Sequence, residues 1–579
     1  MYEQYDPAKL SLPKFVFFTG KGGVGKTSAA CATAVGLADG GNTVLLVSTD
    51  PASNLQDVFE MSLNNERQPI DKLPNLYVAN LDPEESARKY KEAIIGPYRG
   101  LLPETVINEM EEKLSGSCTV EVSAFNEFAN YLTDDDISNK FDYVIFDTAP
   151  TGHSLRLLQL PSAWNKYVSE KEPENVSIGQ YSGLQGRRDE CQKAVETLSD
   201  PHMTKIVLVS KAESISMMET ERAMRELKEL GITSFALIIN GVFQGGDDDI
   251  SRSFFEKQQR VLDEIPEELA CTETYAIPLR SYNIIGIDNL RRLLNGDDLA
   301  DVALPQERIA SRDIRDLIDD LYENKKKVIF MMGKGGVGKT TVAAIVAMGL
   351  WDKGAKVHLT TTDPAAHIQY LIRQNQGITL SRIDEQAVLE EYKEEVMSEA
   401  KLTMDQDALD YLTESLKTPC TQEIAVFRAF SKIVEKADDE VVVIDTAPTG
   451  HTLLLLDSTQ RNSRQMESVQ DEIPQSVRNL LPRLRNKDET EVVIITLPEI
   501  TPVYEAARLQ KDLERAGIFS KWWVVNSSFY LSETENQLLK LKAVTEIKWI
   551  NEAIALSGGN CAVIPWTAGD VMQNAAALG

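Results

Sequence analysis

The sequence predicts an α/β protein made of two tandem copies of one domain, each a mainly parallel sheet flanked by helices. Three observations lead to this prediction. A glycine-rich loop begins at Gly20 and recurs at Gly333, each copy follows a short apolar run, and each precedes an alanine-rich stretch. Short apolar runs next to glycine-rich turns are typical of buried parallel strands. Their alternation with helical stretches is typical of α/β units.

The two loops are identical, G-K-G-G-V-G-K-T, and fit the P-loop pattern G-x-x-x-x-G-K-[S/T]. Backbone N–H groups of such a loop, with the helix behind it, surround phosphates. We therefore expect two tandem P-loop NTPase domains that bind ATP and Mg²⁺. The residues expected to bind the nucleotide are Gly20, Gly22, Gly23, Val24, Gly25, Lys26, Thr27 and Ser28, and Gly333, Gly335, Gly336, Val337, Gly338, Lys339, Thr340 and Thr341. The lysines Lys26 and Lys339 neutralise phosphate charge, and Thr27 and Thr340 can ligate Mg²⁺.

The repeat continues well beyond the loops. Strands are expected before the loops at 14–18 and 327–332, and helices after them at 27–37 and 340–350. Further strands are expected at 43–50 and 356–363, 143–147 and 441–445, 205–209 and 492–496, and 235–240 and 522–526. The separation between matching positions decreases along the chain, so the second copy is the shorter one. We place the first domain at 1–295, a linker at 296–325 and the second domain at 326–579, and expect a surface helix around 314–321 of the linker.

Two pairs of carboxylates end predicted strands. Asp50 and Asp363 follow their loop lysines at the same spacing. A carboxylate there can orient or deprotonate the attacking water, although Asp-Pro also fits a helix N-cap followed by its first residue. Asp147 and Asp445 are expected near Mg²⁺. The turn T-A-P-T-G-H that follows each of them could sense the γ phosphate, or it could be a plain strand-to-loop turn.

Asn240 and Asn526 end the last matching strands. An amide side chain both donates and accepts hydrogen bonds, so it can pair with an adenine edge. Asparagine at a strand end is also a common turn residue. We expect the base-reading role and keep the turn role open.

Composition excludes several classes of protein. The 579 residues carry a formal net charge of −29, which argues against a nucleic-acid partner because phosphate backbones attract a basic face. No stretch approaches the roughly 18 unbroken apolar residues of a membrane span, and the first residues lack the apolar core of a signal peptide. Six scattered cysteines without C-x-x-C argue against a disulfide framework and favour a cytoplasmic location.

The loop, the D-P-A-S/A segment and the D-T-A-P-T-G-H segment, all repeated in one chain, resemble the family of arsenical pump-driving ATPases, ArsA. The guided-entry ATPases, which target tail-anchored membrane proteins, share the same motifs. The resemblance implies that the halves form a pseudo-two-fold intramolecular dimer. It also implies a catalytic role for the extra loop lysines Lys21 and Lys334, each reaching the ATP bound by the other half. An exposed loop lysine without such a role is the alternative.

Within this resemblance, Cys118 and Cys420 occupy matching positions and are expected to bind As(III) or Sb(III), because these soft ions favour thiolates. We expect Cys31, Cys271 and Cys561 to be small buried apolar residues. Ser177 stands where the family has a third thiolate, so Cys191 or a non-protein ligand could complete the site. His153 and His451 could be metalloid ligands or hydrogen-bonded switch residues.

The resemblance implies an ATPase that arsenite or antimonite activates and that drives a membrane arsenite permease from the cytoplasmic face. A small arsenic metallochaperone is left open as a second partner. The alternative is a targeting factor for tail-anchored proteins. That family usually works as a homodimer joined by a C-x-x-C zinc site, which this sequence lacks, and its client groove is rich in methionine. A nucleotide-dependent scaffold or partitioning ATPase would leave Cys118 and Cys420 unexplained.

Overall fold

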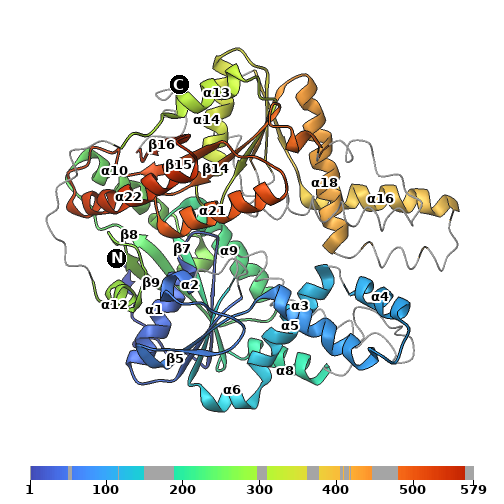
Figure 1. Cartoon of the computed structure of the whole chain (residues 1–579). Coiled ribbons are helices and arrows are strands. Elements are labelled where there is room, and N and C mark those ends of the chain that lie inside the picture. The colour runs from blue at the N-terminus through green and yellow to red at the C-terminus, as the bar shows by residue number, and fades with distance from the viewer. Residues whose placement is uncertain are drawn as a thin grey trace. The chain divides into compact units, whose positions relative to one another are not determined.

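The computed structural model describes residues 2–49, 55–114, 117–148, 188–296, 309–361, 377–403, 419–445 and 482–567, with 409, 416 and 480. The chain divides into two compact units, and each is described by itself. Unit 1 is Met1–Gln244 with Phe255–Leu299, and unit 2 is Gly245–Phe254 with Ala300–Gly579. Each contains one sheet with helices packed against it (Figure 1). The predicted α/β class with two mainly parallel sheets is confirmed.

Unit 1 contains a nine-stranded sheet in the order β1-β9-β8-β7-β2-β6-β3-β5-β4. The strands are β1 (Glu3–Gln4), β2 (Phe15–Thr19), β3 (Val44–Ser48), β4 (Gln68–Ile70), β5 (Leu73–Asn80), β6 (Tyr143–Asp147), β7 (Thr204–Lys211), β8 (Phe235–Val242) and β9 (Glu273–Pro278). Only the edge strand β4 runs antiparallel to its neighbour. The central strands β2, β3 and β6 are almost wholly buried, which explains their continuous apolar sequences.

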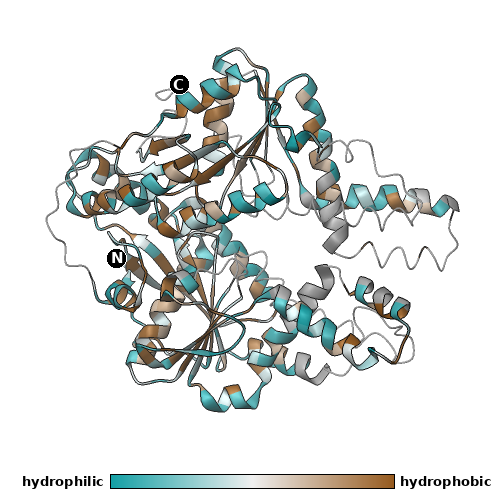
Figure 2. Cartoon of the chain, in the orientation of Figure 1, coloured by the Kyte–Doolittle hydropathy of each residue, from teal (hydrophilic) through white to brown (hydrophobic). Residues whose placement is uncertain are grey.

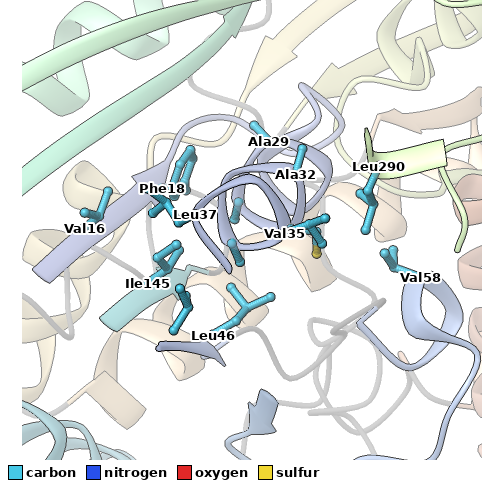
Figure 3. Close-up of a cluster of buried hydrophobic side chains, with 14 of the residues drawn as sticks. Val16, Phe18, Ala29, Ala32, Val35, Leu37, Leu46, Val58, Ile145 and Leu290 are labelled. Atoms are coloured by element: carbon cyan, nitrogen blue, oxygen red, sulfur yellow. The ribbon is translucent and has the colours of Figure 1, made fainter. Parts of the chain in front are cut away.

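Helices cover both faces of this sheet. The helices in this part of the chain are α1 (Lys26–Asp39), α2 (Leu55–Phe59), α3 (Pro83–Ile95), α4 (Glu104–Lys113), α5 (Ser117–Thr133), α6 (Asp135–Lys140), α8 (Arg188–Ser199), α9 (Ser214–Glu229), α10 (Asp249–Asp263), α11 (Glu267–Ala270) and α12 (Ile287–Asn295), with the 3₁₀ turn η1 (Gly96–Tyr98). Helix α4 packs on α3 rather than on the sheet, and the first residues of α10 belong to unit 2. Alternate residues of β2 face opposite sides of the sheet. Val16 and Phe18 pack with α1 and α12, as Figure 3 shows, while Phe15 and Phe17 pack with α5, α8 and α9. Burying each of these phenylalanines contributes roughly 1.5–3 kcal/mol to folding.

Unit 2 contains a seven-stranded, entirely parallel sheet in the order β12-β11-β13-β10-β14-β15-β16. The strands are β10 (Val328–Met332), β11 (Val357–Thr361), β12 (Ile378–Arg382), β13 (Val441–Asp445), β14 (Thr490–Thr496), β15 (Trp522–Ser528) and β16 (Cys561–Pro565). In Figure 2 the strands of both sheets are mostly brown and the exposed helix faces mostly teal, as expected when parallel strands are buried on both faces.

The helices of unit 2 are α13 (Ile314–Glu323), α14 (Lys339–Asp352), α16 (Glu385–Thr403), α18 (Pro419–Glu435), α21 (Ile500–Arg515) and α22 (Gln537–Leu556), with η3 (Lys436–Asp438). One core cluster joins α13 and α14 to the sheet, and another joins α18, α21 and α22. The helix expected around 314–321 is therefore present. Its apolar residues Ile314, Leu317, Ile318 and Leu321 are buried in unit 2 rather than lying on a linker surface.

A short segment from the first half of the sequence belongs to unit 2. In this segment, Asp248 accepts hydrogen bonds from Thr534 Oγ1, at 3.1 Å, and from the backbone N–H of Asn536, at 3.0 Å. The Phe254 ring packs edge-on against the rings of Phe529 and Trp566. Residues 245–254 therefore complete the unit built mainly by the second half.

Candidate active site

The first phosphate-binding loop joins the buried strand β2 to the helix α1. Gly20 has φ 152°, and a Cβ atom there would lie 2.2 Å from the Val209 carbonyl oxygen. Gly25 caps α1 with φ 93°, and a Cβ atom there would lie 2.1 Å from Asn240 Nδ2. Both the backbone angle and the close neighbour require glycine at these positions. The loop sequence is therefore shaped by its packing as well as by phosphate binding.

The second loop, between β10 and α14, repeats this geometry. Gly333 has φ 154°, and its Cβ atom would lie 2.2 Å from the Ile495 carbonyl oxygen. Gly338 has φ 90°, and its Cβ atom would lie 2.2 Å from Asn526 Nδ2. The two halves thus build the same loop, each against the equivalent pair of strands in its own sheet, β7 and β8 in unit 1 and β14 and β15 in unit 2.

The loop lysines fold over their own loops. Lys26 is 6% exposed and donates to the Lys21 carbonyl oxygen at 3.2 Å. Lys339 is 7% exposed and donates to the carbonyl oxygens of Gly333, at 3.1 Å, and Lys334, at 3.0 Å. Each ammonium group therefore lies at the loop whose amides bind phosphate in this motif.

A threonine hydroxyl and a strand-end carboxylate meet beside each loop. Thr27 Oγ1 donates to Asp147 Oδ2 at 2.8 Å, and Thr340 Oγ1 donates to Asp445 Oδ2 at 2.7 Å. In unit 2, Thr361 of β11 also donates to Asp445, at 3.0 Å. Both carboxylates are almost fully buried. These hydroxyl and carboxylate oxygens are the donor types that Mg²⁺ prefers, so the residues present fit that ion.

The strand-end asparagines contact the loops directly. Asn240 Nδ2 donates to the Val24 carbonyl oxygen at 2.8 Å, and Asn526 Nδ2 donates to the Val337 carbonyl oxygen at 3.0 Å. Since a carbonyl can only accept, this bond sets the direction of each amide. The amide oxygen of each asparagine is then directed away from the bond to the loop.

An ion pair holds one of the two extra loop lysines. Lys334 Nζ forms an ion pair with Glu505 Oε1 of α21, and the two side chains are 21% and 12% exposed. Lys21 is half-buried. Glu219 holds the same place in α9 as Glu505 holds in α21. Glu505 was not among the residues predicted for the site, although an alignment of the two halves places a glutamate at this position in both.

Cys118 and Cys420 occupy the same place in matching helices. Each is the second residue of its helix, α5 in unit 1 and α18 in unit 2. Cys191 lies in α8. The side chains of all three lie outside the described part of the structure, as do Asp50, Asp363, His153, His451 and Ser177.

The remaining cysteines were expected to be buried. Cys31 and Cys561 are buried, and burial raises the pKa of the Cys31 thiol and brings that of Cys561 to about 12. Their thiols therefore stay protonated at neutral pH and are poor metalloid ligands. The expectation was wrong for Cys271, which is exposed, because it follows the four-residue helix α11 at the surface.

The described residues contain no group of three or more His, Cys, Asp or Glu side chains placed to hold a metal ion. Among the helices in these same ranges, each is too short or too polar to cross a bilayer. The duplicated loop and the threonine–aspartate pair beside it define the class of tandem P-loop ATPases.

Comparison with known proteins specifies the family. The chain matches the model of the anion-transporting ATPase family over residues 13–296, 326–481 and 458–554. The arsenical pump-driving ATPases of Escherichia coli and Acidiphilium multivorum are each 41% identical to it, with 96% of both chains covered. The ATPase GET3 of Debaryomyces hansenii is 32% identical over 48% of this chain and 88% of its own. The chain belongs to the family of arsenical pump-driving ATPases.

Proposed function

We propose that the chain hydrolyses ATP when arsenite or antimonite binds, and that it thereby energises a membrane permease that extrudes the metalloid. The observation that carries this proposal is the exact duplication of the site. Both halves combine a phosphate-binding loop, a buried threonine–aspartate pair and a cysteine that is the second residue of its helix. Relatives named arsenical pump-driving ATPases align over nearly the whole chain.

At each nucleotide site the loop amides and the lysine, Lys26 or Lys339, bind the β and γ phosphates. Thr27 with Asp147, and Thr340 with Asp445, are the residues that would hold Mg²⁺, which neutralises phosphate charge when bound. Asp50 and Asp363 orient the attacking water or accept its proton.

The asparagines Asn240 and Asn526 read the base. Because Nδ2 of each donates to a loop carbonyl, the amide oxygen remains to accept a hydrogen bond from the adenine amino group. Guanine offers a carbonyl oxygen at the equivalent position, so two acceptors would face each other. This geometry favours ATP over GTP.

Lys21 and Lys334 supply positive charge to the nucleotide bound by the opposite half, when domains 1–295 and 326–579, joined through 296–325, close as a pseudo-two-fold dimer. A cation added where negative charge develops lowers the barrier of phosphoryl transfer. Hydrolysis then depends on closure, so the metalloid can control it.

Cys118 and Cys420 bind the metalloid as thiolates, and His153 and His451 act as further ligands or as switch residues. Cys191 or a non-protein ligand completes the coordination, since position 177 is serine. Binding drives closure only if the metalloid binds the closed arrangement more tightly. The chain works on the cytoplasmic face of the membrane through its permease, with an arsenic metallochaperone as a further partner.

Counting bound metalloid tests this proposal. The wild-type chain, with Mg²⁺ and ATP, should retain arsenite after gel filtration, and Cys118→Ser or Cys420→Ser should abolish retention. Cys271→Ser, which changes an exposed thiol, is the matched control. Absence of retention by the wild type, together with crosslinking to a tail-anchor peptide, would favour the targeting function of the GET3 relatives instead. Counting the thiols that bound metalloid protects tests the third ligand. Protection of only two thiols would exclude Cys191.

A further inference from the structure

Two buried polar residues hold the backbone that follows the strand-end asparagines. They are Gln258 of α10, which is 8% exposed, and Glu546 of α22, which is 1% exposed. Each belongs to the helix that follows the asparagine-bearing strand. Neither residue has a role in the site as described above.

In unit 1, Gln258 bridges both sides of the turn. Its Oε1 accepts from the backbone N–H of Phe243 at 2.8 Å, and its Nε2 donates to the Gly241 carbonyl oxygen at 3.0 Å. Gly241 directly follows Asn240 and has φ 76°. One side chain therefore fixes the residues on which the position of the asparagine depends.

In unit 2, the carboxylate of Glu546 holds the corresponding turn. Its Oε2 accepts from Ser528 Oγ at 2.9 Å and from the backbone N–H of Tyr530 at 3.1 Å. Ser527, between Asn526 and these contacts, has φ 57°, an uncommon angle for a residue with a side chain. Such a conformation persists only where its surroundings hold it.

The asparagines need this support because both lie where their strands leave the regular sheet. The pairing register shifts between Asn240 and Val242 in unit 1, and between Val525 and Ser528 in unit 2. An irregularity of this kind redirects a side chain. A small change in the turn would displace the amide from the loop carbonyl that sets its direction.

We propose that Gln258 and Glu546 are positioning residues that hold Asn240 and Asn526 against the base and so set the preference of each site for ATP over GTP. This inference rests on the base-reading role proposed for the two asparagines. Neither residue is proposed to touch the nucleotide. Each acts through the turn that it fixes.

The test measures ATP and GTP affinity at one site at a time. In a Lys26→Ala background only the second site binds nucleotide. Glu546→Ala should lower ATP affinity there by about tenfold, as loss of about one net hydrogen bond predicts, and leave GTP affinity nearly unchanged. Glu546→Gln keeps the acceptor and should restore the preference. Glu552→Ala, an exposed change on the same helix, should have no effect.

A structural role alone would lower ATP and GTP affinity equally, and that result would overturn the inference. Asn526→Ala, measured in the same background, separates the base-reading role of Asn526 from the positioning role of Glu546. If it abolishes the preference and Glu546→Ala does not, only the positioning role fails. If it leaves the preference unchanged, the base-reading role fails and the positioning role fails with it.

Two further variants keep the test usable where Glu546→Ala does not fold. Ser528→Ala removes one of the two donors to Glu546 and should reduce the preference by roughly threefold. Gln258→Ala in a Lys339→Ala background should reproduce the loss at the first site, with Glu256→Ala as its exposed control. An undiminished preference in both variants would overturn the inference.

Discussion

Lys334 of the second loop is paired with Glu505 of α21, within its own unit and with both side chains largely buried. A lysine held this way must leave its partner before it can serve another nucleotide. Partly buried ion pairs of this kind cost free energy to break. In the proposed mechanism the Lys334–Glu505 pair therefore stabilises the resting state against hydrolysis.

Releasing this lysine should raise the basal rate. We expect Glu505→Gln to increase ATP hydrolysis without metalloid by roughly threefold to fivefold, since an ion pair worth about 1 kcal/mol is removed. Arsenite should then stimulate the variant by a smaller factor. Steady-state ATPase rates with and without arsenite measure both effects. Glu514→Gln, at an exposed position on the same helix, is the control, and an unchanged basal rate in Glu505→Gln would contradict the resting-state role.

The threonine–aspartate pairs should be needed for the Mg²⁺-dependent step. Asp445→Asn should lower turnover at the second site by about 100-fold, because it weakens the hold on the Mg²⁺ that neutralises the phosphates. Thr340→Ser keeps the hydroxyl and should retain most activity. Single-turnover hydrolysis at increasing Mg²⁺ is the measurement. Asp147→Asn should do the same at the first site, and equal Mg²⁺ dependence in variant and wild type would contradict the assignment.

Glu546 should make the stability of unit 2 depend on pH. Burial raises the pKa of its carboxyl from the ordinary 4.5 to about 7, although Lys542 and the hydrogen bonds from Ser528 and Tyr530 lower it. Because the pKa of the Glu546 carboxyl is higher in the folded chain than in the unfolded chain, its contribution to the free energy of unfolding is fully present below about pH 4.5. That contribution is lost as the pH rises through about 7.

Glu546→Gln cannot ionise, so this loss should disappear. We expect the urea midpoint of Glu546→Gln to rise relative to that of the wild type as the pH increases from about 5 to about 8. Glu552→Gln, on the exposed face of α22, is the matched control. Midpoints of wild type and Glu546→Gln that change in parallel with pH would show that Glu546 does not titrate in this range.

The segment 245–254 should contribute to the stability of unit 2. Asp248→Ala removes the acceptor of the Thr534 hydroxyl and one of the two acceptors of the Asn536 backbone N–H, which should cost about 1–3 kcal/mol. Denaturant unfolding followed by the fluorescence of Trp522 and Trp523, both buried in unit 2, reports the change. Asp249→Ala, with a nearly fully exposed side chain, should have little effect. Equal midpoints for the two variants would argue against this role for Asp248.

Much of the fold follows from the sequence because both sheets bury their central strands on both faces. Continuous apolar runs such as those of β2 and β10 leave few alternatives, and the glycines of the loops fix the turns. The outer strands β1, β4, β5, β9, β12 and β16 were not predicted. For β1 and β4 the reason is length, since two or three residues with polar members carry no periodicity.

Contacts between distant residues could not be predicted from local pattern. Glu505 and Glu546 look like ordinary charged helix residues in the sequence. Only the packing of α21 and α22 shows that Glu505 pairs with a loop lysine and that Glu546 is buried beneath the turn after Asn526. Residues 245–254 precede the expected linker, yet they belong to unit 2. Exposure of Cys271 follows from its place after a short surface helix, which composition does not reveal.

In the proposed function, metalloid bound by Cys118 and Cys420 activates ATP hydrolysis. Initial ATPase rates at saturating Mg²⁺ and ATP, measured against arsenite concentration, test it most directly. The wild type should be stimulated severalfold with saturation, whereas Cys118→Ser and Cys420→Ser should keep the basal rate and lose the stimulation. Cys271→Ser should behave as the wild type. A wild-type rate that does not respond to arsenite or antimonite would show that the metalloid does not activate the chain.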